Sequence, residues 1–329
     1  MPERARADVG AIPDTAVDTA VDTAVHIGSV RLANPVMTAS GTSGHGAEFA
    51  AYGDLSSIGA VVVKSLSAGP WAGNPPPRVH PVDGGMINAV GLQGPGVAAW
   101  AAHDLPGLIA AGARVVVSIW GRSVDDYALA ASEVAAAIAD GGGGSPIVAV
   151  EVNLSCPNLA GHGIFAHDAP TSAEVIRVCG GMGRPIWAKL SPNTDRLVTV
   201  AGVVRDAGAE AVTLVNTVTG MVLDPVTGRP ALGNGGGGLS GRLIHPVAVR
   251  AVFDVRTAHP DLPIVGVGGV VDGWSAAELM LAGASAVQVG TASFADPRSV
   301  ARVLDEVDRW CDSHGVVAVR ELIGAAHAP

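Results

Sequence analysis

The segment Asn-Leu-Ser-Cys-Pro-Asn at residues 153–158 brings together side chains that can do chemistry. It follows an apolar run over 147–152, which predicts a buried strand. The amides of Asn153 and Asn158 can both donate to and accept from a flat polar ligand, and the thiol of Cys156 can act as a base or a nucleophile. A structural loop with a buried thiol is the alternative, because free cysteine is among the most buried residue types. This segment alone leaves both interpretations open.

Two lysines, Lys64 and Lys189, lie near the ends of other apolar runs. A single lysine in such a place usually extends its ammonium group to the surface. Two of them at strand ends favour a different interpretation, in which both stabilise an anion or a cofactor in one polar mouth.

Glycine motifs end the last two apolar runs of the chain, Gly268-Gly269 and Gly290-Thr291. Glycine leaves the backbone N–H groups bare and lets a ligand approach closely. In barrels of alternating strands and helices, phosphate binds to the loops after the seventh and eighth strands. The two motifs together therefore predict a phosphate site.

The elements that position these residues are apolar, β-branched runs that alternate with alanine-rich segments of helical character. The runs are Pro35–Ser40, Gly59–Ser65, Arg114–Trp120, Pro146–Ser155, Pro185–Ser191, Ala211–Thr217, Pro263–Gly269 and Ala286–Ala292. This alternation predicts parallel strands joined by helices, and eight units predict a single (β/α)8 barrel. A doubly wound open sheet is the second choice, weakened by the lack of a GxGxxG motif after any strand. A hairpin over Val25–Leu32 is expected to cover the bottom of the barrel.

Composition excludes several classes of protein. The 329 residues carry a net charge of −10 and are 48% hydrophobic, which suits strands buried on both faces and offers no basic patch for nucleic acid. The three cysteines, Cys156, Cys179 and Cys311, show no CxxC spacing. They indicate a reducing cytoplasm and argue against a disulfide framework, a metal site or an iron–sulfur cluster within the chain.

The first 25 residues are of low complexity, with an Asp-Thr-Ala-Val unit at residues 14–17 that is repeated at 18 and 22. They contain neither a signal-peptide core nor a membrane-spanning stretch. We expect a disordered tail over 1–25 and a single domain over 26–329.

The motifs follow one another in a recognisable order. They are NPVMTASG from residue 34, GAVVVKSLSAGPWAGNPPPR from 59, GGMINAVGLQGPG from 84, NLSCPN from 153, AKLSPN from 188, TLVNTVTGM from 213, GGLSG from 237, GVGG from 266 and VQVGTA from 287. Over essentially all of residues 26–310 the chain resembles the dihydroorotate dehydrogenases. Cysteine at position 156 resembles the soluble class 1 enzymes, and GGMINAVGLQGPG and GGLSG resemble class 1B more than class 1A.

The resemblance implies FMN as the cofactor, a pyrimidine as the substrate and no metal. The implied FMN-binding residues are Ser40, Lys64, Ser65, Ser118, Asn153, Lys189, Val215, Gly241, Gly268, Gly269, Gly290 and Thr291. The implied substrate-binding residues are Lys64, Asn88, Ala89, Val90, Gly91, Leu92, Asn153, Asn158, Asn216 and Thr217.

The reaction that the resemblance implies is the oxidation of (S)-dihydroorotate to orotate in de novo pyrimidine (UMP) biosynthesis. Cys156 would remove a proton from C5, and the N5 atom of FMN would take a hydride from C6. Asparagine side chains suit a ring with N–H and carbonyl groups, and the backbone amides of Val90 to Leu92 could bind the carboxylate. Two alternatives remain: a related flavin enzyme that acts on another dihydropyrimidine, such as dihydrouracil, and a non-flavin phosphate-binding barrel.

The class resemblance also implies partners. It implies a homodimer and, for class 1B, a subunit with FAD and an iron–sulfur cluster that passes electrons to NAD in a heterotetramer; fumarate is the alternative acceptor. His45 and His162 are unusual in their loops, and two further residues depart from the pattern. Ser118 stands where class 1B relatives usually have asparagine, and Trp120 stands where a small residue is usual, which predicts a reshaped flavin rim.

Overall fold

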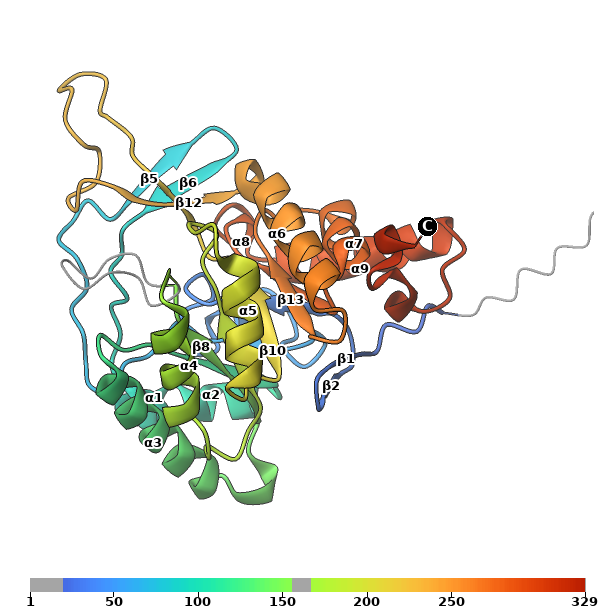
Figure 1. Cartoon of the computed structure of the whole chain (residues 1–329), viewed down its shortest axis with the longest axis horizontal. Coiled ribbons are helices and arrows are strands. Elements are labelled where there is room, and N and C mark those ends of the chain that lie inside the picture. The colour runs from blue at the N-terminus through green and yellow to red at the C-terminus, as the bar shows by residue number, and fades with distance from the viewer. Residues whose placement is uncertain (1–19, 156–166, 329) are drawn as a thin grey trace, which may run out of the picture.

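A computed structural model of the chain describes residues 20–155 and 167–328 (Figure 1). Its central sheet has eight strands, β3 (Val36–Thr38), β4 (Val61–Val62), β7 (Val115–Ile119), β8 (Ile147–Asn153), β9 (Ile186–Lys189), β10 (Ala211–Leu214), β13 (Ile264–Val267) and β14 (Ala286–Val289). All pair in parallel, in the order β3-β14-β13-β10-β9-β8-β7-β4. Each lies within one of the eight predicted runs.

The two ends of this sheet meet and close a barrel. Met37 of β3 forms a parallel bridge with Ala60, just before β4, and the N–H of Thr38 donates to the Ala60 carbonyl over 3.2 Å. An open doubly wound sheet would leave its outer strands unpaired. The predicted (β/α)8 barrel is therefore confirmed, and the open sheet is excluded.

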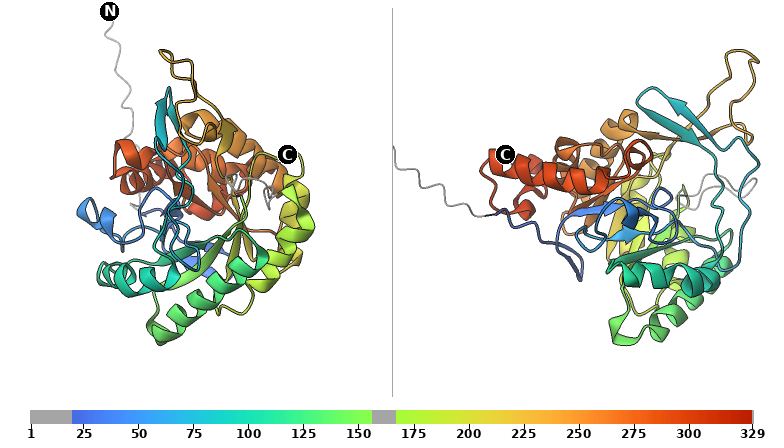
Figure 2. Two further views of the ribbon diagram at one scale, coloured as in Figure 1. Left: turned by 90° about the vertical axis from the view of Figure 1, so that its left-hand side faces the viewer. Right: turned by 180° about the vertical axis from the view of Figure 1, so that it is seen from behind.

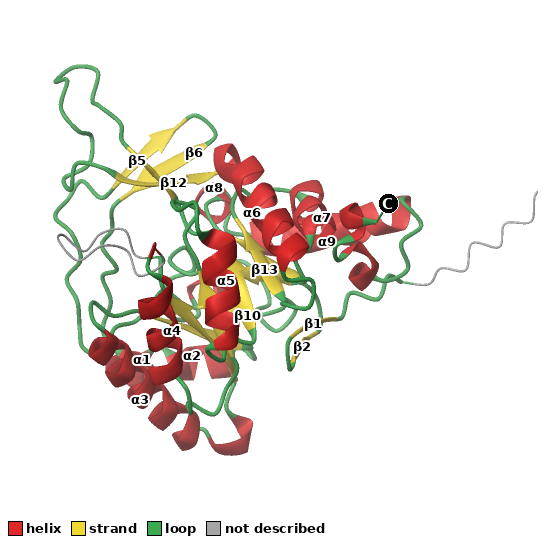
Figure 3. Ribbon diagram, in the orientation of Figure 1, coloured by secondary structure: helices red, strands yellow, loops and turns green. Residues whose placement is uncertain are grey.

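Helices surround the strands, as Figures 2 and 3 show from several sides. They are α1 (Val97–His103), α2 (Leu105–Ala110), α3 (Val124–Asp140), α4 (Ala169–Val178), α5 (Leu197–Asp206), α6 (His245–Ala258), α7 (Gly273–Ala282), α8 (Ala292–Ala295) and α9 (Ser299–Ser313). In α3, the Ser123 side chain accepts a hydrogen bond from the N–H of Asp126 and caps the first turn. Tyr127, Ala130 and Val134 recur at helical spacing and are buried, so this face packs inward. Among the described residues, no helix is long and apolar enough to cross a membrane.

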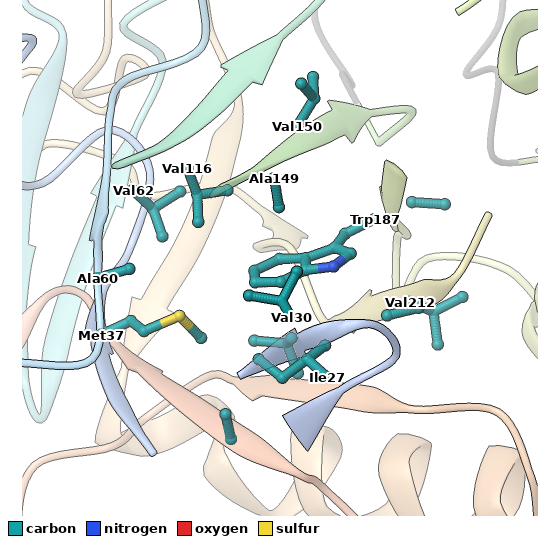
Figure 4. Close-up of a cluster of buried hydrophobic side chains, with 14 of the residues drawn as sticks. Ile27, Val30, Met37, Ala60, Val62, Val116, Ala149, Val150, Trp187 and Val212 are labelled. Carbon is teal, nitrogen blue, oxygen red and sulfur yellow. The ribbon is translucent and has the colours of Figure 1, made fainter. Parts of the chain in front are cut away.

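The predicted N-terminal hairpin consists of β1 (Val25–Ile27) and β2 (Val30–Leu32). Its Ser29 N–H donates to the carboxylate of Glu210 over 2.9 Å, and Glu210 directly precedes β10. The hairpin therefore lies at the N-terminal ends of the barrel strands, and Ile27 and Val30 lie next to Trp187 in the buried core (Figure 4). Most of the predicted tail lies outside the described residues; Asp22, which is described, donates its N–H to Val317.

A second sheet, which the sequence did not predict, has the order β11-β12-β6-β5 and is antiparallel. Its strands are β5 (Val79–Val82), β6 (Gly85–Asn88), β11 (Val218–Gly220) and β12 (Gly237–Gly241). Three of these short strands contain glycine and β5 contains His80 and Pro81, so they lack the continuous apolar signal of the barrel strands. In Figure 1 this sheet lies at the end of the molecule away from the β1–β2 hairpin. It brings two distant parts of the chain, β6 and β12, to the same edge of the barrel.

Candidate active site

A cavity of about 1200 Å³, its open mouth included, lies at the C-terminal ends of the barrel strands. Most of the predicted site residues line it: Ser40, Lys64, Ser65, Asn88, Val90, Gly91, Leu92, Asn153, Lys189, Val215, Asn216, Thr217, Gly241, Gly268, Gly269, Gly290 and Thr291. They come from seven of the barrel strands and from the second sheet, because the carboxyl ends of parallel strands converge.

Several predicted residues are not part of this lining. Ser118 is fully buried beneath it, and its hydroxyl shares a 2.9 Å hydrogen bond with that of Ser65. Ala89 is also buried. Trp120 is buried as well and does not itself line the cavity; it packs against Trp71, and its effect on the rim stays a prediction. Cys156, Asn158 and His162 lie outside the described residues.

Amide and hydroxyl groups at the ends of β8 and β10 form one hydrogen-bonded network. The Asn153 side chain donates to Ser65 over 3.2 Å, and its oxygen accepts from both the N–H and the hydroxyl of Ser155. Asn216 in turn donates to the Ser155 hydroxyl over 2.6 Å. The network holds two amide side chains in one orientation beside the cavity. It also fixes the residue that directly precedes Cys156.

The loop over 90–92 lines the cavity with an unusual backbone. Gly91 has φ of 74° and Leu92 has φ of 58°, both in the left-handed region. For a leucine this conformation costs on the order of 1 kcal/mol, so the surrounding structure must hold it. Within the described parts of the chain, the N–H groups of Val90, Gly91 and Leu92 donate to no protein acceptor. Successive free N–H groups in such a turn form a concave site for an anion.

The opposite end of the cavity is built from backbone. Gly268 and Gly269 follow β13 with φ of 135° and 71°, and a Cβ on Gly269 would lie 2.6 Å from that of His245. The ring of His245 donates through Nδ1 to the Gly268 carbonyl over 2.8 Å, which holds the turn in place. Gly290 and Thr291 follow β14 and lead into α8. This end has the glycine turns that the sequence predicted for a phosphate.

Comparison with known proteins identifies the family. The model of the dihydroorotate dehydrogenase family matches residues 23–310. The chain belongs to the dihydroorotate dehydrogenase family. It is 46% identical over 303 residues to a protein of Geobacter sp. (strain M21) named dihydroorotate dehydrogenase B (NAD(+)), catalytic subunit, and the match covers 92% of this chain and 97% of that one. Relatives of the same name from Desulforudis audaxviator and Geobacter sulfurreducens are 46% and 42% identical, with the same coverage.

One buried charged residue, Glu151 in β8, lies outside the dihydroorotate dehydrogenase motifs and was not predicted from the sequence. Its carboxylate is fully buried, lies 3.4 Å from the Lys189 ammonium and accepts a hydrogen bond from Gln288 over 2.8 Å. The Ser118 hydroxyl lies 3.4 Å from it. A charged residue within the apolar run over 147–152 is a signal that could have found it, because a fully buried carboxylate nearly always has a partner.

The two cavity lysines of this dihydroorotate dehydrogenase family member have different surroundings. Lys189 is paired with Glu151 and also donates to the Ser40 hydroxyl over 3.2 Å. Lys64 has no salt-bridge partner among the described residues. Burial lowers the pKa of the Lys64 ammonium below its usual range, and the nearby positive charge of Arg78 lowers it further. Lys64 is thus the cation in this cavity that most needs an anionic ligand.

Two other thiols differ from what a catalytic base requires. Burial raises the pKa of Cys179 to about 12, and burial together with nearby carboxylates raises that of Cys311 to about 11. Such thiols stay protonated at neutral pH and are poor nucleophiles. Both are structural residues of the core.

Proposed function

We propose that this chain oxidises (S)-dihydroorotate to orotate in pyrimidine biosynthesis, with FMN as its bound cofactor. One observation carries the proposal: a single cavity combines a glycine-lined end, two lysines, oriented amides and a turn with free N–H groups. These groups match the phosphate, the flavin ring, the pyrimidine ring and the carboxylate of such a pair of ligands. Membership of the family supports the same substrate.

The residues present fit FMN. At the phosphate end, a Cβ on Gly290 would lie 3.3 Å from that of Ala39, and one on Gly241 would lie 2.5 Å from the Cα of Gly85. Glycine at these positions lets the backbone segments pack closely together and presents backbone without side chains to the cavity that they line. The hydroxyl of Thr291 is held by a 2.8 Å hydrogen bond to Ser240. FMN supplies an acceptor for the substrate's hydride at its N5 atom. Lys189, held by Glu151, would donate a hydrogen bond to the ring, and the charge of Lys64, unpaired among the described residues, would stabilise the negative charge of the reduced ring.

The substrate would lie between the amides and the turn. Asn88, Asn153 and Asn216 line the cavity, and Asn158 is added from the sequence. Their side chains would hydrogen-bond the N–H and carbonyl groups of the pyrimidine. The N–H groups of residues 90–92 and the ammonium group of Lys64 would hold the carboxylate.

Cys156 would be the base that removes the proton from C5. The proposal rests on its place in the NLSCPN motif, directly after the hydrogen-bonded Ser155. The two other thiols have raised pKa values and lie in the core, so they are unsuited to this role.

Electrons would leave through a partner. The relatives are named catalytic subunits of an NAD-linked enzyme, and the 3 cysteines of this chain are too few for a cluster with four cysteine ligands. We therefore propose a cytoplasmic homodimer that associates with a subunit carrying FAD and an iron–sulfur cluster, which reduces NAD. Direct reduction of fumarate is the alternative.

The test is anaerobic mixing of the purified yellow protein with dihydroorotate, followed by a panel of acceptors. We expect the flavin absorbance to bleach and orotate to form, with turnover on an artificial dye but not on NAD until the partner subunit is added. Dihydrouracil, which lacks the carboxylate, should bleach the flavin far more slowly. A colourless protein, or one that prefers dihydrouracil, would contradict the proposal.

A further inference from the structure

The carbonyl groups of the cavity turn receive hydrogen bonds from one neighbouring segment, residues 71–74. The indole N–H of Trp71 donates to the Gly91 carbonyl over 2.9 Å. The backbone N–H of Asn74 donates to the Val90 carbonyl over 3.0 Å, and its side-chain amide donates to the Ala89 carbonyl over 3.1 Å. Three consecutive carbonyls are thus turned toward the same segment.

This arrangement directs three N–H groups to the other side. In a trans peptide the carbonyl and the N–H of the next residue point in opposite directions. With the carbonyls of residues 89, 90 and 91 bonded to the 71–74 segment, the N–H groups of residues 90, 91 and 92 face away from it. Val90, Gly91 and Leu92 line the cavity, so these N–H groups are directed to its interior.

The 71–74 segment is itself held firmly. The Trp71 ring meets the Trp120 ring edge to face at 5.8 Å, and the Arg122 guanidinium covers it at 4.9 Å. The Trp71 backbone pairs with Gly94 through hydrogen bonds of 2.9 and 3.0 Å. Arg78 donates to the carbonyl of Asn74 over 2.6 Å. The segment can therefore impose its geometry on the turn.

Close approach of the two segments depends on glycine on each side. A Cβ on Gly91 would lie 2.6 Å from the Asn74 backbone nitrogen, and one on Gly73 would lie 2.5 Å from the Val90 carbonyl oxygen. Side chains at these positions would separate the donors of one segment from the carbonyls of the other.

We propose that Trp71 and Asn74 are positioning residues that convert the 89–92 turn into a carboxylate subsite and so select anionic pyrimidines over neutral ones. The proposal rests on the proposed function, because it takes orotate as the ligand. Neither residue needs to touch the ligand. Each acts through the carbonyl that it holds.

The experiment measures the Kd of orotate and of its neutral methyl ester for the FMN-loaded protein, from the change in the flavin spectrum. In Trp71→Phe, which keeps a ring and loses the indole N–H, we expect the Kd of orotate to rise roughly 3- to 10-fold, the effect of one lost hydrogen bond. Asn74→Ala, which removes the bond to Ala89, should give a similar rise. The Kd of the ester should change less than 2-fold, about the resolution of such a comparison.

Trp187→Phe is the matched control. It makes the same chemical change in a ring of the barrel core beside Ile27 and Val30, whose N–H has no hydrogen-bond partner in the described structure, so both Kd values should stay at wild-type levels. Equal weakening of orotate and ester in Trp71→Phe and Asn74→Ala, or unchanged orotate binding in both, would overturn the inference. A wild-type protein that holds FMN but binds neither compound would instead reject the proposed substrate, and the inference with it.

Discussion

Lys64, just after β4, and Lys189, at the end of β9, line the same cavity, but only Lys189 is paired with a carboxylate among the described residues. Lys189 is neutralised within the protein by the fully buried Glu151, 3.4 Å away. Lys64 has no such partner in the described chain and lies close enough to Arg78 for that charge to lower its pKa. A buried pair is a fixed part of the protein, whereas an unpaired buried cation costs free energy until an anion binds.

Lysine thus serves two purposes in this site: one is a fixed part of the protein, and the other is available to bind an anion. Lys189 is held by Glu151 and Ser40, so its position is set before any ligand arrives. Lys64 lines the same cavity as the turn over 90–92, and together they supply the uncompensated positive potential of the cavity. Preorganised charge of this kind stabilises an anion without further rearrangement.

The stability of lysine variants tests most directly whether the pairing of Lys189 with Glu151 distinguishes it from Lys64. Lys189→Ala leaves the Glu151 carboxylate buried without its cation, so we expect the free energy of unfolding of the FMN-free protein to fall by about 3 kcal/mol. Lys64→Ala leaves no carboxylate behind and removes a partly buried cation that has no salt-bridge partner among the described residues, so the free energy of unfolding should change by less than about 1 kcal/mol. Urea unfolding measures both. The double variant Lys189→Met/Glu151→Gln should recover most of the loss, and equal losses in the two single variants would show that the pairing is energetically irrelevant.

Removal of the substrate proton is assigned to Cys156 and to neither lysine, so variants of the thiols test this step separately. Cys156→Ala should retain FMN and bind orotate, but its rate of flavin reduction should fall by about 10²-fold or more, the usual contribution of a general base. Stopped-flow mixing with dihydroorotate measures this rate. Cys179→Ala makes the same change in a buried thiol with a raised pKa and should reduce its flavin at a rate near that of the wild type. A wild-type rate of flavin reduction in Cys156→Ala would show that another group is the base.

The flavin reduction potential should respond more to the loss of the unpaired Lys64 than to the loss of the paired Lys189 and Glu151. Lys64→Gln removes one uncompensated cation, so the potential should fall, by about 30 mV if the charge contributes some 1.4 kcal/mol to the two-electron reduction. Lys189→Met/Glu151→Gln removes one charge of each sign and should shift it less. Potentiometric titration of the two FMN-loaded variants gives the answer. A larger shift in the double variant would mean that Lys64 lies too far from the flavin to influence it.

The smallest expected effect is a pH dependence that belongs to Lys64. Its pKa in the folded protein lies below the usual 10.5, because burial and Arg78 disfavour the charged form. As pH rises through this lowered pKa, the cation is lost and the affinity for orotate should fall.

Stability should change in the opposite direction. Between the lowered pKa and 10.5 the unfolded chain holds a proton that the folded chain has released, so the FMN-free protein should become more stable as pH rises through this window. The difference between the wild type and Lys64→Gln isolates both effects from other titrating groups. If the two proteins show the same pH profiles for orotate binding and for stability, Lys64 does not titrate as described.

Much of the fold could be predicted from the sequence, because the barrel strands carry a local signal. Each of the eight runs, such as 146–155, is apolar and β-branched, and the helices between them are rich in alanine. The cavity lining was also predictable to a large extent, since strand-end residues such as Lys64, Asn153 and Asn216 must converge once the strands are parallel. The binding roles of these residues and the role of Cys156 stay predictions.

The second sheet and the buried charge pair could not be predicted in the same way. Strand β12 is rich in glycine, and it pairs with β6 across 150 residues of sequence, as in the bond between Asn88 and Gly238. The pairing of Glu151 with Lys189 depends on the register of β8 against β9. A run of residues shows its own periodicity but not the register of its neighbour.

The sequence by itself determined the barrel, the family resemblance and the residue types available at the strand ends, because hydrophobic period and motif order are properties of the chain. Only the tertiary structure decided which lysine is neutralised, and that the carbonyls of residues 89–91 face Trp71 and Asn74. The physical reason is that a charge or an N–H group takes its function from the partner it meets in space. For Lys64 and for the 90–92 turn, the described protein supplies no such partner.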